Sequence, residues 1–512
     1  MMMLSIKNIF PAMALFGAIA FQACSKSNIS VNKEDIFNPV SFFPVPPTIW
    51  LSFQGDTYYS SGYVGDVMPY FENDSFHIFY LHDGDAKGGY HPIHEFSTVD
   101  LLHYNYNGKM IPYGSDSAQD RAPGTGSVIK EGNTYYFFYT GHNDLHWSTG
   151  QPVEGIMYAT STDLQNWTKH SGFVMYPSTN NGYAPNDFRD PFVFFNNETN
   201  EYWMLVSTFR NNIPVIALYT TNDLSSDNWT LKSPFFTTDN NSYGVMECPD
   251  VFKMGNYWYF IFSENGVNHT THYRMAASLN GPWIKPAIDV LDGAFFYAGK
   301  TASNGTNRYL FGWVYRKSGE TDYGGNIWGG NLVTHQLAQN TDGTLSVQIP
   351  ETVTDLLSEN ESPTQDSTFN ANVNGNSYTL QANGFVGFGL INGQKKITTV
   401  IKGLQTGSDA GFAFGYGRTG SGDYYKLRIK DGMAYFLKVQ GADEYVDCQV
   451  PFSFTPGNDI NVSIVIDNTI IAITINGKTT LTDRMYWLPN AKWGIYSMQS
   501  GAGFSNLQLF SF

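Results

Sequence analysis

Runs of alternating apolar and polar residues recur five times in the first two thirds of the chain. They begin near His77, Tyr135, Tyr202, Tyr257 and Arg308, about 50 to 70 residues apart. Gly, Asn and Asp separate these runs, and this pattern predicts short antiparallel strands joined by tight turns.

A second signature follows the runs: Ser or Thr, then an Asp-Leu pair, then an aromatic residue. It stands as FSTVDLLHY (96–104), ATSTDLQNW (159–167) and YTTNDLSSDNW (219–229), and in degraded form as AASLNGPW (276–283). We interpret the Asp-Leu pairs as structural turns. Units of this length that each form one sheet are typical of a β-propeller, and five copies predict five blades. The alternative is a β-sandwich with accidental internal similarity, which five copies in order disfavour.

The pattern changes near residue 351. The stretch 351–367 is polar and is predicted to be a linker, and short alternating strands without the Asp-Leu signature follow it to the end of the chain. The sequence therefore predicts an all-β protein, with a five-bladed β-propeller at 49–350 followed by a C-terminal β-sandwich at 368–512. We expect a structural role for the sandwich, because no aromatic platform stands out in it.

Composition fits this fold and narrows the partners. Aromatic residues make up 16% of the chain, there are 50 glycines, and only 14% of residues are charged, which disfavours disorder. The net charge of −16 and the absence of Lys/Arg clusters disfavour nucleic acid and anionic membrane surfaces as partners. A neutral substrate suits this charge, although solubility alone would also explain it.

The first 24 residues resemble a targeting segment. Lys7 precedes an apolar run, Ile9–Phe21, that is too short for a stable membrane span, and the run ends in FQAC at Cys24. This resembles a bacterial lipoprotein signal, with cleavage before Cys24, a lipid on its sulfur, and residues 25–48 as a tether. The alternative is an ordinary secretory signal. We expect an extracytoplasmic protein that meets the membrane only through this anchor. Cys248 and Cys448 lie in different predicted domains, so no disulfide framework is expected.

Three carboxylates precede aromatic runs by nearly constant intervals. Asp66, Asp190 and Glu247 lie 11, 12 and 10 residues before the runs at 77, 202 and 257. We therefore expect them at equivalent places in three blades, grouped around one substrate. Several acids around one substrate indicate an enzyme that cleaves carbohydrates.

Motifs around these acids carry a family resemblance. FRDP and ECPD, the segment GTGSVI (124–129), FFYAGK (295–300) and WGGNLVTHQL (328–337) are similar to glycoside hydrolase family 32, the invertase, inulinase and levanase family. The resemblance covers roughly residues 50–350 in collinear order. It implies a five-bladed propeller followed by a β-sandwich, and activity on β-fructofuranosides.

The resemblance also implies roles for the three acids. Asp66 would be the nucleophile, Glu247 the general acid and base, and Asp190 the group that stabilises the transition state. One motif departs from the family: Tyr-Val-Gly-Asp-Val-Met-Pro stands where the family has Trp-Met-Asn-Asp-Pro-Asn-Gly. Leu81 also replaces a Gln that often holds the sugar. The sugar contacts must therefore differ.

Other candidate contacts are less specific. Candidates for substrate binding are Arg189, Ser127, Tyr297, Trp313 and Trp328, and Trp147 is a further Trp able to stack on a sugar ring. Burial in the propeller core is the commoner fate of a Trp. The eleven His residues show no metal-ligand spacing, and no nucleotide-binding loop is present, so we expect neither metal nor cofactor.

The sequence thus predicts a lipid-anchored retaining hydrolase of β-fructofuranosidic bonds in fructans or fructo-oligosaccharides. Two alternatives stay open. One is a related five-bladed glycosidase acting on another furanoside, such as an arabinofuranoside. The other is a catalytically silent glycan-binding lipoprotein, which retention of all three acids disfavours.

Overall fold

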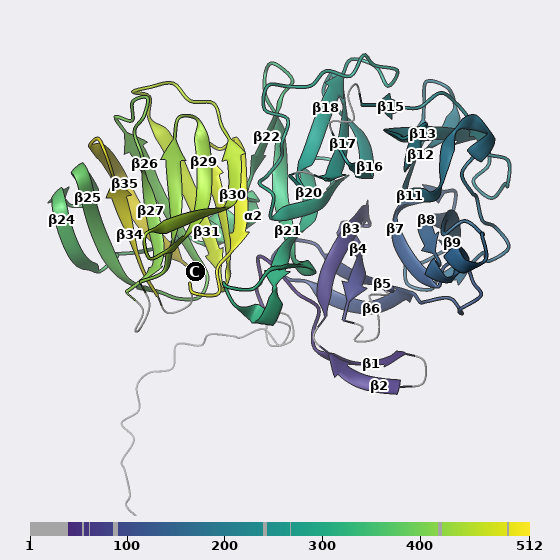
Figure 1. Ribbon diagram of the computed structural model, residues 1–512, viewed down its shortest axis with the longest axis horizontal. Coiled ribbons are helices and arrows are strands. Elements are labelled where there is room, and N and C mark those ends of the chain that lie inside the picture. Colours follow the sequence, from purple (N-terminus) through teal and green to yellow (C-terminus); the bar gives the residue numbers. More distant parts are fainter. Residues whose placement is uncertain are drawn as a thin grey trace, which may run out of the picture. The chain divides into compact units, whose positions relative to one another are not determined.

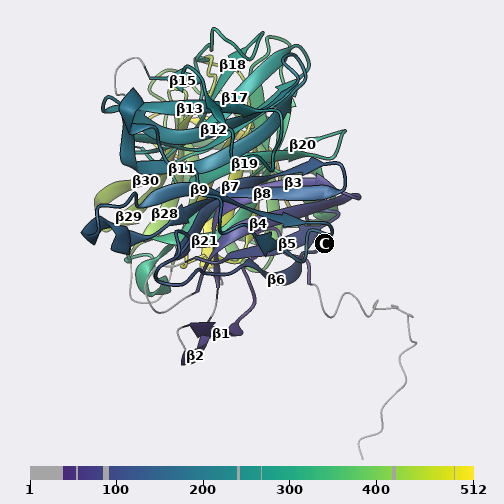
Figure 2. The same ribbon diagram turned by 90° about the vertical axis from the view of Figure 1, so that its right-hand side faces the viewer.

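The computed structural model describes residues 39–53, 56–60, 62–84, 91–238, 243–266, 268–417, 422–488 and 491–512. The predicted signal segment, Cys24 and most of the tether lie outside these residues. Val40–Phe512 forms one compact unit, in which Figures 1 and 2 show radially arranged sheets followed by a layered β-domain. None of the helices in the described part of the chain has the length and apolar character that a membrane span requires.

Five antiparallel blades form the propeller, as the repeats predicted, and the pairing of β21 with β3 joins blades 1 and 5 into one eight-stranded sheet. Blade 1 contains β3 (Tyr63–Glu72), β4 (Ser75–Asp83), β5 (Ile93–Thr98) and β6 (Asn105–Ile111). Blade 2 contains β7 (Ala122–Glu131), β8 (Thr134–His142), β9 (Glu154–Ser161) and β10 (Thr168–Lys169). Blade 3 contains β11 (Tyr183–Asn196), β12 (Glu201–Arg210), β13 (Ile213–Thr221), β14 (Thr230–Leu231) and β15 (Phe236–Thr237). Blade 4 contains β16 (Val245–Met254), β17 (Tyr257–Asn265) and β18 (Thr271–Ala276), and blade 5 contains β19 (Phe296–Ser303), β20 (Arg308–Lys317), β21 (Asn326–Gln339) and β22 (Leu345–Gln348).

Each aromatic run found in the sequence is the second strand of a blade: β4, β8, β12, β17 and β20. These strands are buried on both faces, which explains their continuous aromatic character. Gly330 of blade 5 pairs with Val64 of blade 1, so the last blade meets the first. Short elements lie outside the blades: β1 (Ile49–Phe53), β2 (Asp56–Ser60), η1 (Asp144–Ser148), η2 (Thr179–Asn181) and η3 (Ser318–Glu320).

Every first strand carries a β-bulge at the same level. The register shifts between Val64 and Val67, Pro123 and Gly126, Arg189 and Phe192, Glu247 and Asp250, and Tyr297 and Lys300. In each shift two residues of the first strand stand opposite one residue of the second strand, and a bulge of this kind re-aims the side chains around it. The five bulges therefore form a common level at which polar side chains leave the sheets.

The three acids occupy consecutive positions of this bulge, which corrects the expectation of equivalent positions. Glu247 is the last paired residue before its bulge, Asp190 is the first bulged residue, and Asp66 is the second.

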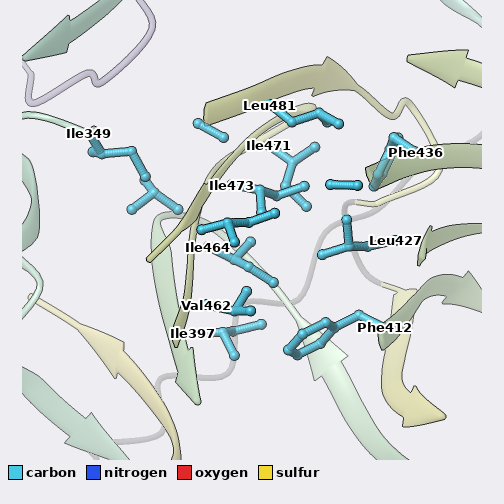
Figure 3. Packing of buried hydrophobic residues seen from close by; sticks show 14 of the residues in the cluster. Ile349, Ile397, Phe412, Leu427, Phe436, Val462, Ile464, Ile471, Ile473 and Leu481 are labelled. Carbon is cyan, nitrogen blue, oxygen red and sulfur yellow. The ribbon is translucent and has the colours of Figure 1, made fainter. Parts of the chain in front are cut away.

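The second domain is a sandwich with one continuous chain of strand pairings. One layer has the order β30 (Asp443–Pro451), β29 (Met433–Gln440), β28 (Tyr424–Lys430), β27 (Ala410–Tyr416), β34 (Ala491–Ser497), β25 (Ser377–Ile391) and β24 (Gln365–Asn374). The other has β35 (Ala502–Ser511), β26 (Lys395–Lys402), β31 (Ile460–Asp467), β32 (Ile470–Ile475) and β33 (Thr479–Arg484). Strand β25 links the layers, because its first half pairs with β35 and its second half with β34. Aliphatic and aromatic side chains from both layers fill the core between them (Figure 3).

The stretch 351–367 is not a plain linker. It contains helix α2 (Glu351–Leu356), strand β23 (Glu359–Glu361), which pairs with β35, and the start of β24. Polar residues occur in linkers as well as in short exposed helices and edge strands, so composition alone did not distinguish these elements from a linker.

Buried polar contacts join the propeller to the sandwich. Asp292 accepts hydrogen bonds from the Thr482 hydroxyl at 2.6 Å and the Thr482 amide at 2.8 Å, and it contacts His335 Nε2 at 2.7 Å. All three side chains are fully buried. The end of the predicted tether also packs here, because Phe42 and Phe43 are buried and the Phe42 amide donates to Asp467. These contacts hold the two domains as one unit.

Candidate active site

Asp66 lies in the bulge of β3, and two other blades position its carboxylate. Trp313 Nε1 of blade 5 donates to Oδ1 at 3.0 Å, and Thr125 Oγ1 of blade 2 donates to Oδ2 at 2.9 Å. Burial and then the nearby Glu247 carboxylate raise the pKa of Asp66 to about 6, against the opposing effect of these two donors. The side chain is fixed in orientation with both oxygens engaged.

The residue before Asp66 shows why the local motif departs from the family. A Cβ on Gly65 would lie 2.0 Å from the indole ring of Trp328, so the ring occupies the space that any side chain at 65 would need. Trp328 stacks on His91, with ring centroids 4.1 Å apart, and meets Trp313 edge-on at 5.5 Å. An asparagine at 65 would therefore require Trp328 to move. In this chain the indole ring of Trp328 fills the space beside Asp66 that the asparagine side chain would occupy.

Glu247 is surrounded by hydrogen-bond donors. Arg189 Nη2 donates to Oε1 at 3.0 Å, the Tyr297 hydroxyl donates to Oε2 at 2.5 Å, and Asn265 Nδ2 donates to Oε1 at 3.3 Å. Burial and the charge of Glu247 raise the pKa of Tyr297 well above its ordinary value, so this hydroxyl keeps its proton. Both carboxylate oxygens of Glu247 are held in place.

Asp190 has a constrained backbone. Its φ of 58° is the left-handed conformation, which is uncommon for residues other than glycine. The Cys248 amide donates to Asp190 Oδ2 at 2.9 Å, and the Asp190 amide donates to Thr140 Oγ1 at 2.8 Å. Burial, and then the charge of Glu247, raise its pKa to about 7 although Arg189 opposes the shift. Backbone strain of this kind persists where the surroundings hold it, and it often accompanies function.

Arg189 connects Glu247 to blade 2. Besides Glu247, its Nη1 contacts Glu154 at 3.3 Å and Asp187 at 3.2 Å. Glu154 also accepts from the Phe188 amide at 2.7 Å. The pKa of the Arg189 guanidinium is raised well above its ordinary value: the charges of Glu154, Glu247 and Asp190 outweigh the opposing effect of burial, so it stays cationic.

The remaining predicted contacts divide into two kinds. Tyr297 and Trp313 lie in the site, where each donates a hydrogen bond to a carboxylate: Tyr297 to Glu247 and Trp313 to Asp66. Trp313 is fully buried and has no face open for stacking. Ser127 is buried too, and its hydroxyl donates to Pro191 O and accepts from the Val193 amide, so it ties β7 to β11. Burial and the acids beside it raise the pKa of Cys248 well above its ordinary value, which leaves a neutral thiol.

Three polar residues of the site were not singled out in the sequence: Thr125, Asn265 and Glu154. Thr125 had a usable signal, because it occupies the same bulge position in blade 2 as Asp66 does in blade 1. Asn265 ends β17 and Glu154 begins β9, and no repeated residue marks either of these strand ends. Within the described residues, no group of three or more His, Cys, Asp or Glu side chains forms a potential metal site.

Three carboxyls at the bulges of a five-bladed propeller form a cluster of the kind that glycoside cleavage requires. The model of the glycosyl hydrolases family 32 N-terminal domain matches residues 66–347. The chain therefore belongs to glycosyl hydrolase family 32 and is a hydrolase of the β-fructofuranosidase type.

Relatives extend over both domains. Sucrose-6-phosphate hydrolase of Escherichia coli is 23% identical over 466 residues, covering 84% of this chain and 89% of the relative. The levanbiose-producing levanase of Bacillus subtilis (strain 168) is 23% identical over 481 residues, covering 87% of each chain. The crystal structure of exo-inulinase from Aspergillus awamori superposes with a TM-score of 0.68 at 17% identity, covering 92% of this chain and 98% of that one. The propeller-plus-sandwich fold predicted from the sequence is thus confirmed.

Proposed function

We propose that this protein hydrolyses β-fructofuranosidic bonds in fructans or fructo-oligosaccharides with retention of configuration. The supporting observation is the placement of Asp66, Asp190 and Glu247 on the first strands of blades 1, 3 and 4, close enough for their charges to shift the pKa values of Asp66 and Asp190. Two of these carboxyls are oriented by separate donors, Asp66 by Trp313 and Thr125, and Glu247 by Arg189 and Tyr297. Independent orientation suits two carboxyls with different tasks.

In the proposed mechanism, Asp66 attacks C2 of the fructofuranosyl unit while Glu247 gives a proton to the leaving oxygen. The C2–O bond of the substrate breaks, and an ester bond forms between C2 and Asp66. Glu247 then takes a proton from water, which attacks C2 and releases Asp66 as a carboxylate. Asp190, held by the Cys248 amide, accepts hydrogen bonds from sugar hydroxyls as positive charge develops on the ring.

The raised pKa of Asp66 predicts an acidic limb in the pH profile of kcat/KM. Burial and then the charge of Glu247 raise this pKa to about 6, and protonated Asp66 cannot attack C2. We therefore expect kcat/KM to fall as pH is lowered through about 6, measured by initial rates in a constant-ionic-strength buffer series. A profile without this fall between pH 8 and pH 5 would contradict the role of ionised Asp66.

Product analysis tests the substrate class. The purified protein is incubated with sucrose, inulin, levan and an arabinan, and the released sugars are identified. Release of fructose from at least one fructan supports the proposal. Release of arabinose alone would instead support the second candidate, a glycosidase that acts on another furanoside. The observation that motivates this candidate is the Gly65–Trp328 arrangement beside Asp66.

The cellular location rests on the sequence alone. We propose a lipid anchor at Cys24, because FQAC ends a short apolar run. Replacing Cys24 with Ser is expected to move the protein from the membrane fraction to the soluble fraction, measured by immunoblot after ultracentrifugation. Cys448→Ser serves as the matched control, and an unchanged membrane fraction of the Cys24 variant would contradict the anchor.

A further inference from the structure

An exposed tryptophan, Trp147, stands at the end of blade 2 that carries the β7 bulge, which is the catalytic end of the propeller. Trp147 belongs to η1, in the connection between β8 and β9, and 66% of its surface is exposed. Leu145 beside it is 44% exposed. Among the described residues, Trp147 has no ring or hydrogen-bond partner. Folding therefore does not require this indole, in contrast to the buried Trp313.

The strand register places this connection on the catalytic side. His142 at the end of β8 pairs with Glu154 at the start of β9, and also with Ala122 at the start of β7. Ala122 lies three residues before Thr125, which donates to Asp66. The connection 143–153 therefore leaves the blade at the end where the bulges present the acids.

Contacts place the same connection near the proton donor. Glu154 follows the connection directly and contacts Arg189, which donates to Glu247. His142 precedes the connection and lies 3.5 Å from Glu154. Because Glu247 protonates the leaving oxygen, the part of the substrate that leaves must lie on its side of the site. The Trp147 loop thus stands on the side of the leaving group.

The loop is held rigidly, although its tip is exposed. Asn143 is fully buried, accepts from the Leu145 amide and donates to two main-chain carbonyls, Asp116 O and Ala118 O. His146 is buried and contacts Pro152 O at 3.0 Å. A fixed loop presents an aromatic ring at little entropic cost to a ligand.

We propose that Trp147 is a stacking platform for the sugar units beyond the cleaved bond, so that the protein acts on chains longer than a disaccharide. This rests on the proposed function. A neutral sugar ring offers an apolar face to an indole, and a net charge of −16 disfavours anionic ligands. A disaccharide places only one sugar unit beyond the cleaved bond. Trp147 stands five residues after β8 and seven before β9, near the tip of the loop, so we expect longer chains to gain from it.

Kinetics on a chain-length ladder test the platform. Trp147→Ala and Trp147→Phe are assayed with sucrose, short inulin-type oligosaccharides, inulin and levan. We expect Trp147→Ala to raise KM for the longest cleaved substrate about five- to tenfold, with sucrose kinetics changed less than about twofold and Trp147→Phe in between. Tyr445→Ala is the matched control, because Tyr445 is 51% exposed on the sandwich. An equal change on short and long substrates, or no change, would overturn the proposal.

A binding assay separates this proposal from the proposed function. The ladder is titrated onto the Glu247→Gln protein and onto Glu247→Gln with Trp147→Ala, and affinity is measured by calorimetry. Tighter binding with chain length, lost in the double variant, supports the platform even if the wild-type protein cleaves none of the fructans. Affinity that does not depend on Trp147 overturns the platform, even if fructose release supports the proposed function.

Discussion

Glu247→Gln is expected to lower turnover of natural oligosaccharides by about 10²–10⁴-fold, the usual contribution of general acid–base catalysis. The amide keeps the shape of the side chain, and its oxygen can still accept from Arg189 while its NH2 group donates to the Tyr297 hydroxyl, but it has no acidic proton for the leaving oxygen. Initial rates on sucrose and on the best fructan measure the loss. A substrate with an activated aryl leaving group needs no protonation, so we expect partial recovery with it.

The control for this variant is Glu131→Gln. Glu131 ends β7, the far end of the strand from the bulge, and accepts from the Tyr202 hydroxyl. Its replacement is expected to leave the rates within about twofold. Near-normal turnover of natural oligosaccharides by Glu247→Gln would show that another group is the acid.

The sequence predicted the blades well because each blade has a second strand buried on both faces. Such strands require continuous aromatic and aliphatic runs, and the five runs made the repeat visible. The acids were found because they precede three of these runs. Their exact relation was not predictable, since the bulges shift Glu247, Asp190 and Asp66 by one residue each and leave no signature in composition.

The sequence predicted which residues lie in the site better than it predicted what their side chains contact. Trp313 was expected to touch a sugar, yet it is buried and orients Asp66 from another blade. Ser127 was expected in the same role, and its hydroxyl joins two first strands. The observed roles of both side chains depend on contacts with residues far apart in the chain, which a sequence pattern does not show. Trp147 illustrates the opposite case, because only the structure separates an exposed Trp from a core Trp.

Asp66→Asn is expected to abolish formation of the covalent glycosyl-enzyme while leaving the fold intact. The amide cannot attack C2, but its oxygen can accept from Trp313 Nε1 and its NH2 group can donate to the Thr125 hydroxyl, which also serves as an acceptor. Trapping with a slow fructosyl substrate, followed by mass spectrometry of the labelled peptide, measures the intermediate directly. We expect the label on Asp66 in the wild-type protein and no label in the variant.

Thermal stability gives a second, independent signal at the same residue. The folded-state pKa of Asp66 is raised from 3.8 to about 6, so ionised Asp66 disfavours folding above about pH 6, and this cost disappears as pH falls below 3.8. Asp66→Asn should therefore raise the melting temperature at pH 8 and change it little at pH 3.5.

Asp74→Asn is the matched control, because Asp74 lies in the turn between β3 and β4 at the opposite end of the blade, with a φ of 59° that Asn adopts readily. It should keep both the label and the wild-type melting curve. A label on a peptide without Asp66 would exclude it as the nucleophile. Inverted product stereochemistry would exclude the retaining mechanism itself, because a double displacement through an Asp66 ester returns the configuration of the substrate.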